Sequence, residues 1–300
     1  MPYTTSGICL IIYTYIYSFR TYAFVAPEQS VKLAKVLLKK VHSAADLTLC
    51  TSPQLAQELR DLDVPGVDVW RKGINTEIFS PIFKSQAMRE RLSNGYPDAP
   101  LLLYVGRLGK EKKVNRLKKV LNDNPGARLA LVGSGPAEEE LRELFKDYPN
   151  VHFIGPLTGV ALSEAFASSD IFLMPSDSET LGFVVLEALA SGIPVVGVAA
   201  GGLIDIIDHE KTGYLAVNGD DMTEFSAHTT TLIQNIELRK QIGQQAREYA
   251  VKWSWESATS ILRNIQYQQA ITNHRNSQYD KDEAQRILVQ QGELYRPDLA

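Results

Sequence analysis

The chain has 300 residues, of which 44% are hydrophobic and 22% charged, and its 31 basic and 35 acidic residues give a net charge of −4. This composition is typical of a globular protein of about two domains, and it offers no basic excess of the kind that nucleic-acid-binding proteins show. Cys9 and Cys50, the two cysteines, do not form a CxxC pair, so we expect neither a metal cluster nor a disulfide framework.

An apolar run, GICLIIYTYIYSF, occupies residues 7–19. It is shorter than the ~20 residues that span a bilayer, no basic segment precedes it, and no clear small-residue cleavage site follows it. We interpret it as a buried, tyrosine-rich strand, with a membrane-associated or targeting segment as the alternative.

Residues 29–43 have apolar residues at helical spacing and lysines mostly off that face. This basic face is either a surface for anionic lipid or an ordinary solvated helix face. The lysines are Lys32, Lys35, Lys39 and Lys40.

A strand is predicted over 45–52 and a helix over 52–62, with Ser52 as its N-cap and Pro53 at its first position. A strand over 67–73 follows. The segment 81–100 is polar and contains NGYPDAP, which predicts a linker or a domain seam there or just before it.

From residue 101 onward, apolar runs without polar alternation are each followed by a helical pattern. This order indicates a parallel sheet covered on both faces, in the doubly wound α/β class. Ligands of such sheets bind outside the carboxyl ends of the strands. Residues 221–250 are predicted to be mostly helical, and the polar tail from about 273 to be loose or weakly helical. The predicted strands are LLLYVGR, ARLALVG, VHFIGP, DIFLMPS, IPVVGVA and GYLAV.

Basic and glycine-rich turns follow the first two of these strands. Arg107, directly after the first strand, can aim its planar guanidinium at a phosphate, and Lys112 can add a point charge. The alternative is a solvated turn. The GSGP turn at 133–136 is either a tight turn before a helix or a place where a ligand approaches the backbone closely.

The segment 178–196, SETLGFVVLEALASGIPVV, holds two acids around an apolar run. A helix is predicted to begin near 180–183 and to end at Gly192. Its N-terminal amides offer an anion site, while Glu179 and Glu187 can accept hydrogen bonds from hydroxyl groups. Basic residues and helix amides for phosphates, with two acids for sugar hydroxyls, describe a nucleotide-sugar site.

These motifs together resemble the retaining glycosyltransferases of the GT-B fold, of the group 1 type. The resemblance rests on Arg107 with Lys112, the GSGP turn, and the E-x7-E spacing of Glu179 and Glu187, which occur in order at the expected strand ends. Over roughly residues 44–270 the chain is similar to the plant and algal sulfoquinovosyltransferases, which make the sulfolipid. The segments that carry this similarity include WRKGINTEIFSP, SETLGFVVLEALASGIPVV and AGGLIDII.

The resemblance implies an enzyme that moves a sugar, sulfoquinovose, from a UDP-sugar to a lipid acceptor, diacylglycerol, with retention of configuration. It implies three catalytic residues: Arg107 and Lys112, which contact the diphosphate, and Glu179, which holds the donor sugar. It also implies that Glu187 binds the ribose. No metal and no cofactor are implied, since the UDP-sugar is a substrate. Three further residues are implied to lie near the uracil, namely Gly155, Pro156 and Leu157, and two are implied to contact phosphate through their backbone amides, namely Thr180 and Leu181. The remaining implied donor-binding residues are Gly106, Gly133, Gly135 and Gly182.

The implied fold is α/β of GT-B type: a complete C-terminal Rossmann-like doubly wound parallel sheet and an incomplete N-terminal Rossmann-like domain. The expected divisions are a partial acceptor-side domain (1–72), a donor-binding domain (73–252), a crossover helix (253–272) and a polar tail (273–300). Residues 13–24, YTYIYSFRTYAF, contain no histidine, although the relatives have one there as a candidate active-site group. We therefore interpret the chain as N-terminally truncated.

Two alternatives to an active sulfolipid enzyme stay open. One is a catalytically impaired nucleotide-sugar-binding fragment, and the other is a transferase with another sugar or acceptor, such as a glucan. The resemblance implies a chloroplast membrane location with peripheral membrane contact. Without a clear targeting segment, the location would otherwise be cytoplasmic.

Overall fold

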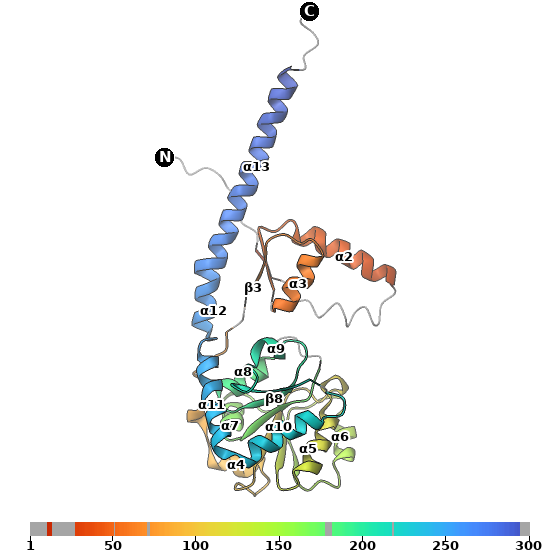
Figure 1. Ribbon diagram of the computed structural model, residues 1–300, viewed down its shortest axis with the longest axis vertical. Helices are drawn as coiled ribbons and strands as arrows, with labels where there is room; N and C mark the ends of the chain where they lie inside the picture. Colours follow the sequence, from red (N-terminus) through yellow and green to blue (C-terminus); the bar gives the residue numbers. More distant parts are fainter. Residues whose placement is uncertain are drawn as a thin grey trace, which may run out of the picture. The chain divides into compact units, whose positions relative to one another are not determined.

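The computed structural model describes residues 11–13, 28–50, 52–70, 73–177, 182–217 and 219–294 (Figure 1). The chain divides into two compact units. Unit 1 combines residues 1–71 with 258–300, and unit 2 comprises residues 72–257. The predicted donor-binding segment, 73–252, lies within unit 2.

A six-stranded parallel sheet forms the centre of unit 2, in the order β6-β5-β4-β7-β8-β9. This is the strand order of a Rossmann-type doubly wound sheet, so the predicted fold class is confirmed. The register is regular from Leu101↔Arg128 to Val105↔Val132 between β4 and β5. The strands are β4 (Leu101–Val105), β5 (Arg128–Val132), β6 (Val151–Gly155), β7 (Ile171–Met174), β8 (Val195–Val198) and β9 (Gly213–Ala216).

Two separate hydrophobic cores cover the two faces of this sheet. Leu101, Leu103 and Val105 of β4 belong to one core, while Leu102 and Tyr104 belong to the other. Because side chains alternate along a strand, both faces of each strand are buried, which explains its unbroken apolar sequence. The first core packs α4 (Gln86–Leu92), α7 (Gly159–Ala167), α8 (Phe183–Ala190), α9 (Leu203–Ile206) and α11 (Ile236–Val251); the second packs α5 (Leu117–Asp123), α6 (Glu138–Leu144) and α10 (Thr223–Gln234).

The sequence predicted a linker or a domain seam in the segment 81–100 or just before it. The boundary between the two units lies before it, between residues 71 and 72, and the segment itself is not a linker. It forms a 3-10 turn, Pro81–Phe83, and the helix α4, whose Met88 and Leu92 are buried in the first core. The hydroxyl of Ser85 caps α4 by accepting a hydrogen bond from the Met88 amide, at 3.2 Å. Two apolar residues four positions apart are enough to bury one face of a short helix. Because the residues around them are polar, the composition of the segment did not indicate a helix.

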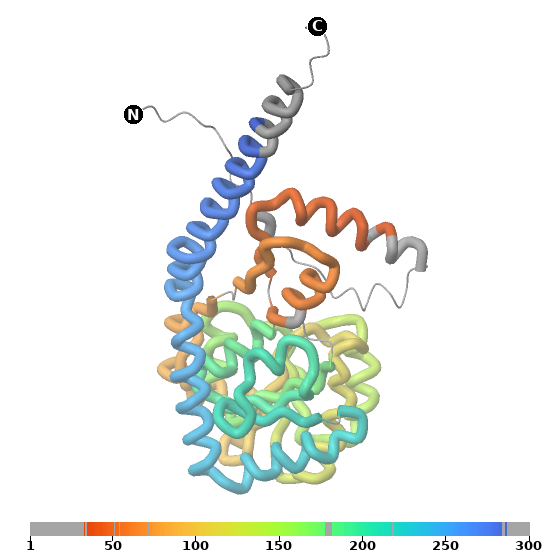
Figure 2. Tube along the Cα trace, turned by 45° about the horizontal axis from the view of Figure 1, so that its top comes forward, coloured from red at the N-terminus to blue at the C-terminus, as the bar shows by residue number. Residues whose placement is uncertain are grey.

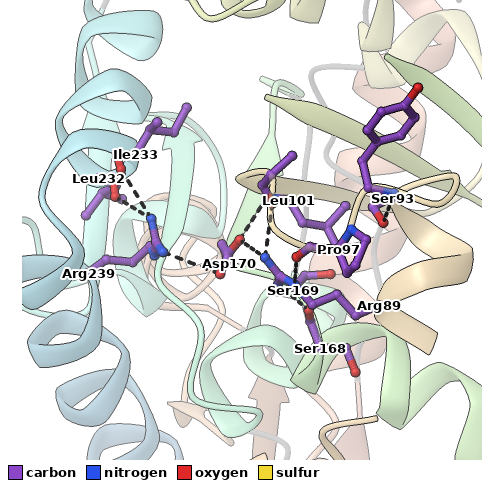
Figure 3. A network of polar contacts seen from close by, with 12 residues as sticks. Arg89, Ser93, Pro97, Leu101, Ser168, Ser169, Asp170, Leu232, Ile233 and Arg239 are labelled. Carbon is purple, nitrogen blue, oxygen red and sulfur yellow. Dashed lines mark hydrogen bonds and ion pairs between the residues drawn. The ribbon is translucent and has the colours of Figure 1, made fainter. Parts of the chain in front are cut away.

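Arg89 of α4 is part of a polar network at the amino ends of β4 and β7 (Figure 3). The Asp170 carboxylate accepts hydrogen bonds from the Arg89 guanidinium and from the Leu101 amide, both at 2.8 Å. The guanidinium of Arg239, on α11, lies 3.5 Å from the other carboxylate oxygen. One mostly buried acid therefore joins α4, two central strands and α11. Arg89 also donates to the carbonyls of Pro97, Ala99 and Ser168.

The described part of unit 1 holds a three-stranded parallel sheet in the order β1-β2-β3, with β1 at Ile11–Tyr13, β2 at Leu47–Cys50 and β3 at Val67–Val69. β1 confirms a strand for part of the run 7–19, whose other residues lie outside the described ones. The helices of its N-terminal part are α2 (Glu28–His42) and α3 (Pro53–Asp61). As predicted, Ser52 caps α3 by accepting from the Leu55 amide, at 3.2 Å, and Pro53 takes the first helical position.

The C-terminal helical segment comprises α12 (Trp255–Ile261), a π-helical turn (Leu262–Gln266) and α13 (Tyr267–Leu294), as Figures 1 and 2 show. Within unit 1 it is fastened to β3 by the Gln266 amide, which donates to the Asp68 carboxylate at 2.8 Å. The tail from residue 273, predicted to be loose or weakly helical, is helical as far as residue 294: it belongs to α13, whose sequence contains no proline and a single glycine, Gly292, close to its end. Within the described residues, no helix combines the length and the apolar composition needed to cross a bilayer.

Candidate functional site

The topological switch point of the unit 2 sheet lies between β4 and β7. The strand order runs from β4 through β5 to β6 on one side and from β7 through β8 to β9 on the other. The connections after β4 and β7 therefore diverge at the carboxyl edge, and the crevice between them is where doubly wound sheets bind ligands. Arg107 follows β4 and Asp177 follows β7, so these two charged residues lie on the two connections that diverge at the switch point.

The glycines at the ends of β4 and β5 allow neighbouring loops to touch. A Cβ atom on Gly133 would lie 2.0 Å from the Gly106 carbonyl oxygen, and one on Gly135 would lie 2.4 Å from the carbonyl oxygen of Leu108. Gly133 also donates its amide to the Gly155 carbonyl at the end of β6, at 2.9 Å. The GSGP segment is thus a tight turn whose glycines are required by packing between loops. A ligand-binding role for these glycines stays a prediction.

Arg107 points into solvent and pairs with Glu111. The two side chains are 3.1 Å apart and 65% and 46% exposed. An exposed ion pair of this kind contributes no more than about 1 kcal/mol, so an incoming phosphate can replace Glu111 at little cost. Lys112 is half-buried at the end of a 3-10 turn, Lys110–Lys112, and a second turn, Val114–Arg116, follows. The interpretation as a solvated turn therefore fits Arg107, whose side chain is mostly exposed, better than it fits the half-buried Lys112.

A second group of charges, which the sequence did not single out, fixes this loop to the end of β7. The Lys113 ammonium contacts the Asp177 carboxylate, and the Arg116 guanidinium lies 3.7 Å from the same carboxylate. Arg116 also pairs with Asp220, at 2.7 Å. Lys113 adopts a left-handed backbone conformation with φ of 51°, which is unusual for a residue with a side chain. These contacts hold the basic loop against the segments that follow β7 and β9.

The segment 178–181, which contains Glu179, Thr180 and Leu181, lies outside the described residues. Gly182 follows as the N-cap of α8, with φ of 60°. A left-handed conformation costs a residue with a side chain roughly 1–2 kcal/mol, which accounts for glycine at this position. The helix begins at Phe183, within the range that the sequence predicted.

Glu187 lies at the start of the second turn of α8, with Val185, Leu186 and Ala188 fully buried around it. Burial raises its pKa from 4.5 to about 7. Glu187 is therefore not on a fully exposed helix face, and near neutral pH it exists in both protonation states. The ionised form can accept hydrogen bonds from a ligand's hydroxyl groups, and the protonated form can also donate one.

The turn after β6 is more open than the turns after β4 and β5. Gly155 has φ of 80°, and a Cβ atom there would have no neighbour within 4 Å. Pro156 is exposed, whereas Leu157 packs against the first core. The turn thus has room beside its backbone, as a site for a planar base requires.

Residues 89–249 match the family of the glycosyl transferases group 1, which covers more than half of the chain. The chain belongs to this family. It is 46% identical to the sulfoquinovosyl transferase SQD2 of Arabidopsis thaliana over 78% of its own length and 47% of that protein's. It is 32% identical to a GDP-mannose-dependent alpha-mannosyltransferase of Mycobacterium tuberculosis, over 80% of its length and 61% of that protein's.

Solved structures of glycosyltransferases share the fold. Sucrose-phosphate synthase from Thermosynechococcus elongatus aligns with a TM-score of 0.74 and 26% identity, covering 87% of this chain and 68% of that one. Anabaena HepE in complex with UDP aligns with a TM-score of 0.74 and 18% identity, covering 85% of this chain and 71% of that one. This group 1 glycosyltransferase chain therefore has the GT-B type of α/β organisation, and it spans about half to three fifths of the length of the curated relatives named here.

Proposed function

We propose that this chain binds a UDP-sugar at the switch point of the unit 2 sheet and transfers the sugar to a lipid acceptor with retention of configuration. The observation that carries the proposal is the basic loop after β4, held beside the crevice by Asp177 in a chain of the group 1 family. The binding of UDP by Anabaena HepE, which shares the fold, supports the choice of nucleotide.

The proposed donor is a UDP-activated sulfoquinovose and the proposed acceptor is diacylglycerol. The printed name of the Arabidopsis relative, a sulfoquinovosyl transferase, and its 46% identity support the sugar. Diacylglycerol as acceptor, and a plastid membrane as its location, follow from the resemblance to the sulfolipid-forming enzymes.

In this proposal, Arg107 and Lys112 contact the diphosphate and stabilise the charge that develops on it as the glycosidic bond breaks. The diphosphate itself takes the acceptor's proton on the same face of the sugar, which retains the configuration. Glu179 holds hydroxyls of the donor sugar, Glu187 binds the ribose, and residues 155–157 lie against the uracil. The amides of residues 180 and 181 supply further phosphate contacts.

A second candidate is a nucleotide-sugar-binding chain that does not catalyse transfer. The described part of unit 1, the proposed acceptor side, favours it. Its sheet has three strands, whereas the sheet of unit 2 has six. A third candidate is transfer to a different acceptor, such as a glucan.

The first test measures UDP binding by calorimetry for the unmodified chain, Arg107→Ala and Arg142→Ala. Arg142 is the matched control because it also forms an exposed i,i+4 ion pair, with Glu138 at 2.8 Å, but on α6. Losing a charged hydrogen bond to phosphate costs about 1.5–3 kcal/mol, so Arg107→Ala is expected to weaken binding roughly 10- to 100-fold, and Arg142→Ala less than twofold. Equal affinities for the three chains would refute the site.

The second test separates transfer from binding. Lipid extracts from reactions with UDP-sulfoquinovose and diacylglycerol are analysed by mass spectrometry, with UDP-glucose and a glucan acceptor in parallel. Sulfolipid formed by the unmodified chain supports the proposed transfer. UDP binding without product from either pair establishes the second candidate, and glucan extension establishes the third.

A further inference from the structure

Asp177, which follows β7, contacts the basic loop (residues 107–116) that follows β4. The Lys113 ammonium contacts its carboxylate, and the Arg116 guanidinium lies 3.7 Å from it. These two basic side chains are 30% and 17% exposed and that of Asp177 is 35% exposed, whereas Arg107 is 65% exposed. Water and salt therefore screen the charges around Asp177 less than they screen the ion pair of Arg107.

A second contact joins the same two segments. The hydroxyl of Ser176, which is fully buried, donates a hydrogen bond to the Glu111 carbonyl at 3.4 Å. Because β4 and β7 are paired strands, the segments that follow them begin side by side. Two consecutive residues after β7, Ser176 and Asp177, thus contact two neighbouring parts of the basic loop.

The backbone of Lys113 is unusual. Its φ of 51° lies in the left-handed region, which glycine adopts readily and a residue with a side chain adopts at a cost. Backbone strain of this kind persists where surrounding contacts maintain it, and it is frequent at functional sites. The contact of the ammonium with Asp177 gives a reason for lysine at a position that suits glycine.

The chain neighbours of this contact are the groups proposed for catalysis. Lys113 directly follows Lys112, the proposed contact to the diphosphate. Asp177 precedes Glu179, the proposed contact to the sugar, by two residues. Two residues of extended chain span at most about 7 Å, so fixing Asp177 limits the positions that are open to Glu179. One acid is therefore connected closely to the proposed groups on both sides of the switch point.

We propose that Asp177 is a positioning residue for sugar transfer. By holding the basic loop against the start of the segment that carries Glu179, it sets the distance between the diphosphate contacts and the sugar contact. UDP alone does not use the sugar contact, whereas cleavage of the bond between sugar and diphosphate needs both. Loss of Asp177 therefore lowers the rate of transfer much more than the affinity for UDP. This inference rests on the proposed function.

The test measures kcat, KM for the donor and the dissociation constant of UDP. The substrates are UDP-sulfoquinovose with diacylglycerol, or UDP-glucose with a glucan if the unmodified chain uses that pair. Asp177→Asn removes the charge at nearly constant size, and Lys113→Gly removes the ammonium where the left-handed backbone suits glycine. Both are expected to lower kcat about 10- to 100-fold, as a displacement of about 1 Å can, and to change UDP affinity less than ~3-fold.

The two substitutions change the charge of the site in opposite directions. An effect of charge alone on the anionic donor would therefore have opposite signs in the two variants, whereas loss of positioning lowers kcat in both. Asp177→Glu keeps the carboxylate and is expected to retain most of the rate. The matched control is Glu140→Gln, because Glu140 on α6 pairs with Lys110 of the same loop at 2.9 Å but does not precede Glu179. Urea unfolding verifies that each variant is folded.

An unchanged kcat in Asp177→Asn, or an equal loss of kcat in Glu140→Gln, would overturn the proposal. So would opposite effects of Asp177→Asn and Lys113→Gly, which would indicate charge alone. A loss of UDP affinity as large as the loss of kcat would also overturn it, because Asp177 would then serve only to keep the site folded. If the unmodified chain transfers sugar and Asp177→Asn does so equally well, this inference fails alone. If the unmodified chain transfers sugar with neither pair of substrates, the proposed transfer fails and this inference fails with it.

Discussion

Replacing Glu187 with glutamine is expected to remove a loss of stability that the unmodified chain undergoes as the pH rises. In the folded chain, burial raises the pKa of Glu187 from 4.5 to about 7, whereas in the unfolded chain the group ionises at its ordinary value. Between these two values unfolding releases a proton, so the folded state loses stability with rising pH. The contribution is fully present below pH 4.5 and is lost as the pH rises through 7. At 1.36 kcal/mol per pH unit, the loss is about 3 kcal/mol.

The assay is urea unfolding of the unmodified chain and of Glu187→Gln at pH 4.5 and at pH 8. The other titrating groups are common to both chains, so the difference between their free energies of unfolding isolates Glu187. We expect that difference to move in favour of the glutamine variant by about 3 kcal/mol between the two pH values. A difference that does not change with pH would refute the burial argument.

The same residue tests the ribose contact. Hydrogen bonds from ribose hydroxyls favour the ionised carboxylate, whose fraction rises about tenfold between pH 6 and pH 8 when the pKa is about 7. UDP affinity of the unmodified chain should therefore rise by up to about tenfold over this range relative to the glutamine variant. Because a phosphate group also titrates near pH 6, the comparison is made between the two chains at each pH. Parallel affinity profiles would remove Glu187 from the donor site.

Two further substitutions test the packing that supports the site. Asp170→Ala leaves the mostly buried guanidinium groups of Arg89 and Arg239 without their shared acid, so it is expected to lower the free energy of unfolding by about 3 kcal/mol. The control, Glu237→Ala, breaks an exposed ion pair with Lys240 and should change the free energy of unfolding by less than about 0.5 kcal/mol. Urea denaturation measures both, and equal effects would contradict the role given to Asp170. Gly133→Ala is expected to cost about 1–3 kcal/mol because its Cβ atom would meet the Gly106 carbonyl, whereas Gly126→Ala meets no atom within 4 Å and should be close to neutral. A neutral Gly133→Ala would show that the loops after β4 and β5 separate easily.

Much of the candidate site could be located from local sequence because each of its loops follows a buried strand. Arg107, Gly133 and Gly155 each come directly after an apolar run or close it, and parallel strands bring their carboxyl ends to one edge. The role of the glycines could not be predicted from the sequence, because a glycine required by a neighbouring loop and a glycine required by a ligand are indistinguishable in a single sequence. Only the 2.0 Å separation at Gly133 reveals the packing requirement.

The charges around Asp177 show the same limit. The sequence did not single out Lys113 and Arg116, and Asp177 lies more than sixty residues further along the chain. An acid directly after a buried strand indicates a possible partner, but the choice of partner depends on which strand is the neighbour. The pairing of β4 with β7 makes that choice.

The sequence by itself determined the features that depend on near neighbours along the chain. The apolar runs indicated buried parallel strands, Ser52 and Pro53 marked the start of α3, and a glycine marked the end of α8. The tertiary structure decided the features that depend on distant segments: the burial of α4 in unit 2, the bridging of Arg89 and Arg239 by Asp170, and the exposure of Leu33 and Leu37 on α2. The apolar residues of α2 look the same in the sequence whether they pack or face solvent, because only the presence or absence of a partner segment decides between the two.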